Sequence, residues 1–190
     1  PPETREPAAV EEDEGGTWQG FDRATLMLLG ALLLAVTLFR SAYEQVGNTV
    51  ALWANEGVDR TAFAFEIPMT WFQSLNPMIV ILLTPFLLAR WRRQAEAGTE
   101  HSPLQKMAIG ALVVACAYVL LAFAAAIQQD GQASWIWLVA FFVILTTGEL
   151  YILPNGLGIF ARIAPQRLGA STVASWFFAI FTGSLAGGLV

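Results

Sequence analysis

Three ionisable residues stand inside long apolar stretches of this 190-residue chain, and they are the first candidates for chemistry. Arg40 and Glu44 lie four positions apart, so on a helix they share a face. Glu149 lies in a second apolar stretch, after Thr146-Thr147-Gly148. An ionisable side chain at the centre of a bilayer costs about 2.5–3.5 kcal/mol on insertion scales. Each of the three is therefore a candidate for a substrate or ion pathway.

The Arg40–Glu44 pair has two interpretations. In one, the two charges neutralise each other and let a long helix insert. In the other, they lie on the wall of a solvated cavity and contact a ligand or another helix. Tyr43, Gln45 and Asn48 surround the pair. We favour the cavity, because a lone neutral pair does not explain so many polar neighbours.

Glu149 has no basic residue within a helical turn in the sequence. A carboxylate in apolar surroundings holds a proton near neutral pH, and an opposite charge from another helix releases it. A side chain that alternates between these two states could couple proton movement to transport. The alternative is a protonated or hydrogen-bonded glutamate with a structural role.

Further candidates are amide and aromatic residues in two other apolar stretches. Asn76 precedes Pro77, which removes a backbone donor and bends a helix. Asn76 could satisfy the freed backbone or face a ligand. Trp176 and Phe177 could pack, face lipid or wall a pocket, and the residues alone leave these possibilities open.

Five apolar segments position these candidates. Hydrophobic residues make up 56% of the chain and charged residues 13%, whereas soluble domains carry about 25% charged residues. A bilayer core of about 30 Å requires roughly 20 helical residues. The segments show no alternation of period two, so we predict an all-α membrane protein rather than a β-barrel. The predicted spans are about 23–54, 68–91, 104–127, 133–161 and 169–190.

The segments outside the predicted spans indicate their orientation. Residues 1–20 are acidic and poor in apolar side chains, which predicts a flexible linker. Basic residues concentrate in alternate loops, and basic loops stay cytoplasmic. These residues are Arg90, Arg92, Arg93, Lys106, Arg162 and Arg167. The linker is then predicted to be cytoplasmic as well.

Several functional classes find no support in the sequence. Cys116 is the single cysteine and His101 the single histidine, so we expect neither a disulfide framework nor a metal site. Motifs for nucleotide binding, hydrolysis and redox chemistry are missing, which argues against an enzyme. The basic residues follow membrane topology rather than nucleic-acid binding. Because the chain starts without Met and ends within an apolar stretch, we expect a piece of a longer protein.

Several short motifs resemble those of the proton-dependent oligopeptide transporters. Residues 43–49 (Tyr-Glu-Gln-Val-Gly-Asn-Thr) are similar to the family's seventh-helix pattern, and residues 71–77 (Trp-Phe-Gln-Ser-Leu-Asn-Pro) to its eighth-helix pattern. Residues 148–157 and 164–167 resemble the tenth helix and the loop that follows it. Trp176-Phe177 is spaced as in the eleventh helix. The resemblance covers about residues 21–190, in the family's order.

The resemblance implies a fold of the major facilitator superfamily. The chain would supply helices seven to eleven of the C-terminal helical bundle, and the N-terminal six-helix half would belong to the same transporter. It also implies residue roles, with Glu44 in gating and proton coupling, and Asn76 in binding the peptide terminus. Glu149 would contact the peptide amino group or pair with a lysine of the family's fourth helix, and it would carry protons. Trp176 and Phe177 would wall the pocket. Arg40 stands where many members carry Trp, and Leu153 where many carry Ser.

The implied function is proton-coupled symport of di- and tripeptides by alternating access. The coupling ion is the proton, and no other cofactor is expected. The partners are di- and tripeptides, membrane lipid and the missing half. A transporter of another substrate, such as nitrate or a drug-like amine, is the first alternative. A non-transporting membrane scaffold is the second, and it would gain nothing from Glu44 and Glu149 in the bilayer.

Overall fold

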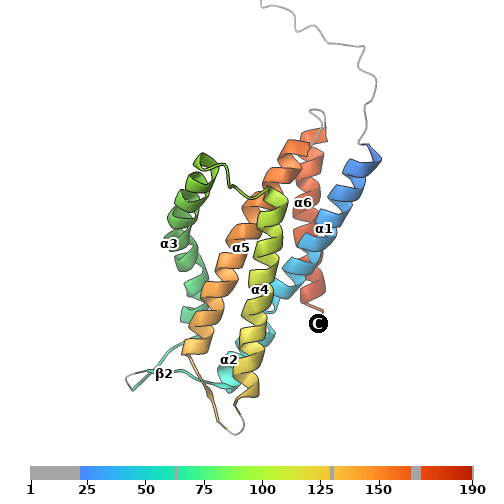
Figure 1. Cartoon of the computed structure of the whole chain (residues 1–190). Coiled ribbons are helices and arrows are strands. Elements are labelled where there is room, and N and C mark those ends of the chain that lie inside the picture. Colours follow the sequence, from blue (N-terminus) through green and yellow to red (C-terminus); the bar gives the residue numbers. More distant parts are fainter. Residues whose placement is uncertain (1–21, 63, 129–130, 164–167, 190) are drawn as a thin grey trace, which may run out of the picture.

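The computed structural model describes residues 22–62, 64–128, 131–163 and 168–189 (Figure 1). The predicted linker 1–20 lies outside these residues, as does Arg167. The described helices are α1 (Arg23–Glu44), α2 (Thr49–Glu56), α3 (Met69–Glu96), α4 (Pro103–Ala126), α5 (Ile136–Ile163) and α6 (Gly169–Gly187). The described strands are β1 (Val58–Asp59), β2 (Thr61–Ala62), β3 (Phe65–Glu66) and β4 (Ala133–Ser134).

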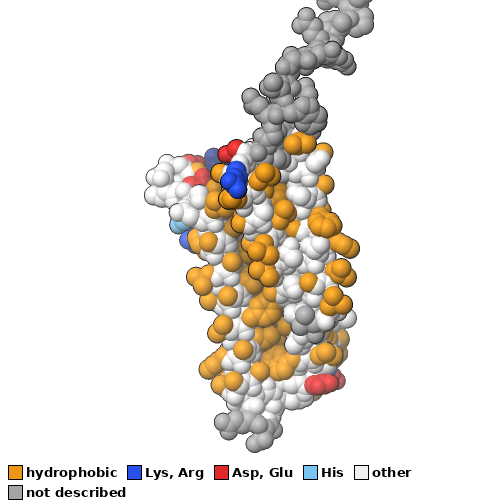
Figure 2. Space-filling model, turned by 90° about the vertical axis from the view of Figure 1, so that its right-hand side faces the viewer, with side chains coloured by type: hydrophobic (Ala, Val, Ile, Leu, Met, Phe, Trp, Pro, Cys, Tyr) orange, Lys and Arg blue, Asp and Glu red, His pale blue; other side chains and the backbone are white. Residues whose placement is uncertain are grey.

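Within the described residues, five spans are long and apolar enough to cross a bilayer, with α1 and α2 together forming the first. The prediction of an all-helical membrane fold with five long apolar helices is therefore confirmed. Hydrophobic side chains cover much of the height of the face shown in Figure 2, and charged side chains gather near its ends. This distribution is the one that a bilayer requires.

The first span is broken rather than continuous. The helix α1 ends at Glu44 and α2 begins at Thr49, inside the predicted segment 23–54, which contains Gly47 and is longer than one straight bilayer crossing needs. Two side chains in the break, Gln45 and Asn48, donate to the carbonyl of Gly187 in α6, at 3.0 Å and 3.3 Å. These bonds anchor the break to a neighbouring helix, which gives the polar groups a partner away from water.

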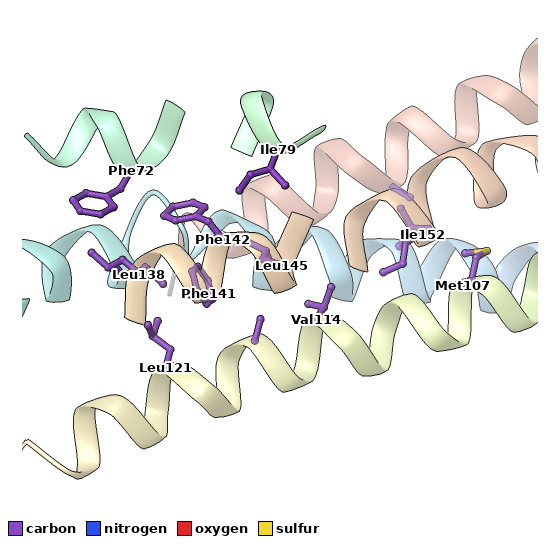
Figure 3. Packing of buried hydrophobic residues seen from close by; sticks show 14 of the residues in the cluster. Phe72, Ile79, Met107, Val114, Leu121, Leu138, Phe141, Phe142, Leu145 and Ile152 are labelled. Carbon is purple, nitrogen blue, oxygen red and sulfur yellow. The ribbon is translucent and has the colours of Figure 1, made fainter. Parts of the chain in front are cut away.

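The helix α5 lies at the centre of the bundle. It packs against α3, α4 and α6, while α1 packs mainly against α6. In Figure 1, α5 separates α3 from α4. Phe141, Phe142 and Leu145 of α5 are fully buried, and Figure 3 shows them between Phe72 of α3 and Leu121 of α4. Glu149 is one turn beyond Leu145, so the core fixes the height and direction of this carboxylate.

Two glycines allow α4 and α5 to come close together. A Cβ atom on Gly148 would lie 2.8 Å from the carbonyl oxygen of Gly110, and one on Gly110 would lie 2.7 Å from that of Gly148. Small residues at such crossings let helix backbones meet, and this contact is a main source of helix association in lipid. The crossing lies next to Glu149 in the sequence and holds its helix in place.

The ends of the spans opposite the basic loops are joined by short strands that the sequence analysis did not predict. The strand β1 pairs in parallel with β4, and β2 pairs with β3 in a hairpin. Ala133 donates its backbone N–H to the carbonyl of Gly57 at 2.8 Å, and the Gln128 side chain donates to the same carbonyl at 2.6 Å. The end of α2 is thus tied to the connection between α4 and α5.

Candidate substrate and proton site

The predicted pair of Arg40 and Glu44 forms on α1 and extends to α6. The Arg40 Nη2 and Glu44 Oε1 atoms are 2.5 Å apart. Ser184 of α6 joins them, because its hydroxyl accepts from Arg40 Nε at 2.9 Å and donates to Glu44 Oε1 at 2.7 Å. Both charged side chains remain about 30% exposed, at 28% and 30%. The pair is therefore neutralised within this chain and is also open on one side.

Two glycines bring α6 close enough for Ser184 to reach the pair. A Cβ atom on Gly183 would lie 2.6 Å from both Arg40 Cβ and the carbonyl oxygen of Thr37. A Cβ atom on Gly187 would lie 2.8 Å from Glu44 Cβ. Gly183 and Gly187 form a small-xxx-small stripe, which is typical of close helix contacts in membranes. Neither Ser184 nor this stripe was predicted from the sequence, although the four-residue spacing of the glycines is a signal that could have identified them.

Asn76 and Glu149 meet between α3 and α5. The Asn76 Nδ2 atom donates to Glu149 Oε2 at 2.9 Å and to the Thr146 hydroxyl at 3.2 Å. Both Asn76 and Glu149 are half-buried. The described hydrogen bonds of the Asn76 amide therefore go to side chains of α5 rather than to the backbone near Pro77, and a role for Asn76 in facing a ligand stays a prediction. Thr146 is fully buried, and sequence reasoning had not singled it out.

Tyr43 lies beside the pair on α1. Its ring lies under the Arg40 guanidinium, with 4.9 Å between the guanidinium carbon and the ring centroid. The Tyr118 hydroxyl of α4 donates to the neighbouring carbonyl, that of Ala42, at 2.5 Å. Polar contacts thus join α1 to α4 and α6, and a separate contact joins α3 to α5 at Glu149.

The structure separates the two predicted wall residues. Trp176 is 2% exposed and packs edge-on against Phe160 of α5, with ring centroids 5.3 Å apart. Its ring fills the space above Gly156, where a Cβ atom would come within 2.2 Å of it. Phe177 points the other way and is 57% exposed. In this chain Trp176 is a packing residue between α5 and α6, and a role for either residue as a pocket wall stays a prediction.

The arrangement suits binding and charge exchange rather than bond-making chemistry. Each carboxylate accepts hydrogen bonds from neutral donors, Ser184 for Glu44 and Asn76 for Glu149, and Glu44 also pairs with a guanidinium. A carboxylate in such a setting can bind an ammonium group or a proton and can change partners when helices move. Over the residues that the structure describes, no cluster of His, Cys, Asp or Glu could hold a metal ion.

A multi-pass helical bundle with ionisable side chains inside its spans is an arrangement found in membrane transporters. Within that class, residues 19–190 match the POT family, and the chain belongs to this family. It is thus part of a transporter rather than an enzyme, and the family resemblance of the sequence is confirmed.

Two bacterial relatives illustrate the similarity. The chain is 37% identical over 172 residues to the peptide transporter YePEPT of Yersinia enterocolitica, covering 89% of this chain and 34% of that protein. It is 29% identical over 178 residues to dipeptide and tripeptide permease A of Escherichia coli K12, covering 93% and 35%. The chain therefore spans about a third of the length of these relatives.

Solved structures agree with the fold. A crystal structure of a peptide transporter POT in complex with sulfate superimposes with a TM-score of 0.80 at 26% identity, covering 88% of this chain and 34% of that one. A mutant of a peptide transporter POT in complex with alafosfalin gives a TM-score of 0.81 at 24% identity, a likeness that concerns the fold alone.

Proposed function

We propose that the full-length protein is a proton-coupled symporter of di- and tripeptides that works by alternating access. The observation that carries this proposal is the 2.9 Å hydrogen bond from Asn76 to Glu149, which joins two helices through an amide and a carboxylate. A peptide has an ammonium group at one end and a carboxylate at the other. Glu149 can receive the ammonium group, while the Asn76 amide can turn to the peptide terminus.

The proposal assigns the chain to helices seven to eleven of a twelve-helix transporter. The six-helix N-terminal half would supply the second wall of the cavity and most of the basic pole that holds the peptide carboxylate. Such transporters bind substrate near the middle of the membrane between their two halves. The protein would lie in the cell (inner) membrane, with residues 1–20 and the basic loops on the cytoplasmic side.

The two carboxylates would have different tasks in the cycle. Glu149 would bind the proton or the peptide amino group. Its hydrogen-bond donor Asn76 is neutral, and no ion pair of the described residues includes Glu149. Glu44 is already paired with Arg40 on its own helix. The gate at Glu44 would therefore open by rearrangement of a pair within one half, with Ser184 of α6 moving with it.

Uptake of a labelled dipeptide by the full-length protein in liposomes, driven by an imposed pH gradient, tests this function. The wild type should accumulate the dipeptide, and a proton ionophore should abolish accumulation. Glu149→Gln keeps the shape and removes the carboxylate that would hold the proton and the peptide amino group, so it should abolish proton-driven uptake and weaken dipeptide exchange as well. Glu96→Gln is the matched control, because Glu96 pairs with Arg92 on an exposed helix end.

The outcomes separate the alternatives. If the wild type transports nitrate or a drug-like amine and no dipeptide, the peptide assignment fails and the transporter class remains. If Glu149→Gln retains proton-driven accumulation, Glu149 is not the coupling group. If no solute moves under any gradient, the protein acts as a scaffold.

A further inference from the structure

A hollow at the end of α3 is set apart from the polar contacts described above. It encloses about 350 Å³ beside the turn that joins α3 to α4. Its lining residues are Phe86, Ala89, Arg90, Arg93, Gln94 and Thr99. The first five recur at intervals of three and four, so they form one stripe along α3. The stripe changes from apolar at Phe86 to cationic at Arg90 and Arg93.

The turn after α3 builds the second wall of the hollow. Gly98 adopts a φ of +66°, which reverses the chain direction. Thr99 then donates its backbone N–H to the carbonyl of Gln94 at 2.9 Å. The carbonyls of Arg93 and Ala95 also receive backbone donors, from Ala97 and Gly98. These three carbonyls at the end of α3 thus have backbone partners.

The ion pairs of this region divide its basic residues into two groups. Arg92 pairs with Glu96 at 3.0 Å, and Lys106 pairs with Glu100 at 2.6 Å and covers the ring of Trp91. Among the ion pairs of the described residues, Arg90 and Arg93 take part in none. Among the four basic residues around this turn, the two without a carboxylate are therefore the two that line the hollow, while Arg23 and Arg162 elsewhere in the described residues also form no ion pair. The positive-inside rule explains why basic residues lie at this end of the span. It does not explain why the two that line the hollow are those without a carboxylate partner.

Phe86 places one end of the hollow within the apolar part of the span. It lies one helical turn below Arg90, towards the middle of the apolar span, and is 73% exposed. A ligand that fits this stripe has an apolar part beside Phe86 and an anionic group at Arg90 and Arg93. Guanidinium groups bind phosphate oxygens with two donors at once. Basic pockets at this level of membrane proteins bind anionic headgroups.

We propose that this hollow is a binding site for the phosphate headgroup of an anionic phospholipid. Arg90 and Arg93 would bind the phosphate, the Gln94 amide and the Thr99 hydroxyl would face the polar headgroup, and an acyl chain would run along Phe86. The occupant is a lipid rather than a free anion, because the apolar end of the stripe has no use in binding an ion. The site does not depend on the transported substrate.

Lipid titration of the purified full-length protein in detergent, followed by native mass spectrometry, tests the site. Phosphatidylglycerol is the probe, and phosphatidylcholine is the neutral comparison. A basic side chain near an anionic lipid surface contributes about fivefold in affinity. Arg90→Gln and Arg93→Gln should each weaken phosphatidylglycerol binding by about that factor. Arg92→Gln removes the same charge two positions away and should leave binding within about twofold.

Three results would overturn the proposal. The first is equal weakening by all three substitutions, which would mean attraction by loop charge alone. The second is displacement of phosphatidylglycerol by excess inorganic phosphate, which would make the ligand a free anion. The third is unchanged binding in Arg90→Gln and Arg93→Gln, as expected if the rest of the transporter covers the hollow. Thermal unfolding of each variant shows that it is folded, and the measurement needs no transport activity.

Discussion

The contact between Gly148 and Gly110 gives a sharp prediction for the change Gly148→Ala. A Cβ atom on Gly148 would meet two backbone atoms of α4, the Gly110 carbonyl oxygen at 2.8 Å and the Val114 nitrogen at 3.0 Å. Ordinary contact begins at 3.4 Å, so the two helices must separate by about 0.6 Å. Rotation of a side chain cannot relieve this overlap, because both atoms are backbone.

The expected cost follows from the overlap. Overpacking of a tight contact costs about 1–3 kcal/mol. Alanine also favours helix over glycine, by up to about 1 kcal/mol, so the single variant alone would understate the cost. Gly158→Ala on the same helix measures that gain separately, because a Cβ atom there meets nothing within 4 Å. Gly148→Ala should therefore be less stable than Gly158→Ala by about 1–3 kcal/mol.

Reversible unfolding of the full-length protein in mixed micelles, followed by tryptophan fluorescence, measures this difference. The wild type and the two alanine variants are compared at the same detergent composition. Equal free energies of unfolding for Gly148→Ala and Gly158→Ala would refute the tight crossing of α4 and α5. We expect Gly148→Ala to have a lower free energy of unfolding than the wild type, and Gly158→Ala to have an equal or higher one.

Three further predictions use the same full-length protein. Trp176→Ala should lower the free energy of unfolding by about 3–5 kcal/mol, because Trp176 is 2% exposed, whereas Phe177→Ala should change it by at most about 0.5 kcal/mol. A large loss in Phe177→Ala would show that another part of the transporter covers this ring. Ser184→Ala removes one hydrogen bond to each of Arg40 and Glu44, so it should lower the free energy of unfolding by about 1–3 kcal/mol in the same assay. An unchanged free energy would mean that the Arg40–Glu44 pair does not depend on α6. Asn76→Ala would remove the hydrogen bond proposed between this amide and the charged peptide terminus, which contributes about 1.5–3 kcal/mol. The dipeptide concentration for half-maximal uptake should therefore rise by roughly 10- to 100-fold. Wild-type uptake kinetics would place Asn76 outside the binding site.

The sequence predicted the parts of the site that depend on local spacing. Arg40 and Glu44 are four residues apart, and a helix necessarily places such residues on one face, so their pairing followed from the spacing. The break after Glu44 was foreshadowed only by Gly47 and the surrounding polar residues. Its position depends on the carbonyl of Gly187, which is 142 residues beyond Gln45, and no local pattern identifies such a partner.

The partners of the carboxylates could not be predicted for the same reason. Ser184 is 140 residues from Glu44, and Asn76 is 73 residues from Glu149. The direction of Trp176 was open because a tryptophan in an apolar helix is equally stable against lipid and against protein. Lipid tails are as apolar as leucine, so hydropathy marks a span without marking its inner face.

By itself, the sequence determined that the chain crosses a membrane in five apolar spans, where the charged residues stand along them, and that its motifs are those of peptide transporters. Hydropathy and helical spacing are local properties, so they can be recognised from the sequence alone. Only the tertiary structure decided which charges meet which neutral donors, because close approach depends on Gly148 and Gly183 at two helix crossings. These crossings bring α5, which carries Glu149, against α4, and α1, which carries Glu44, against α6.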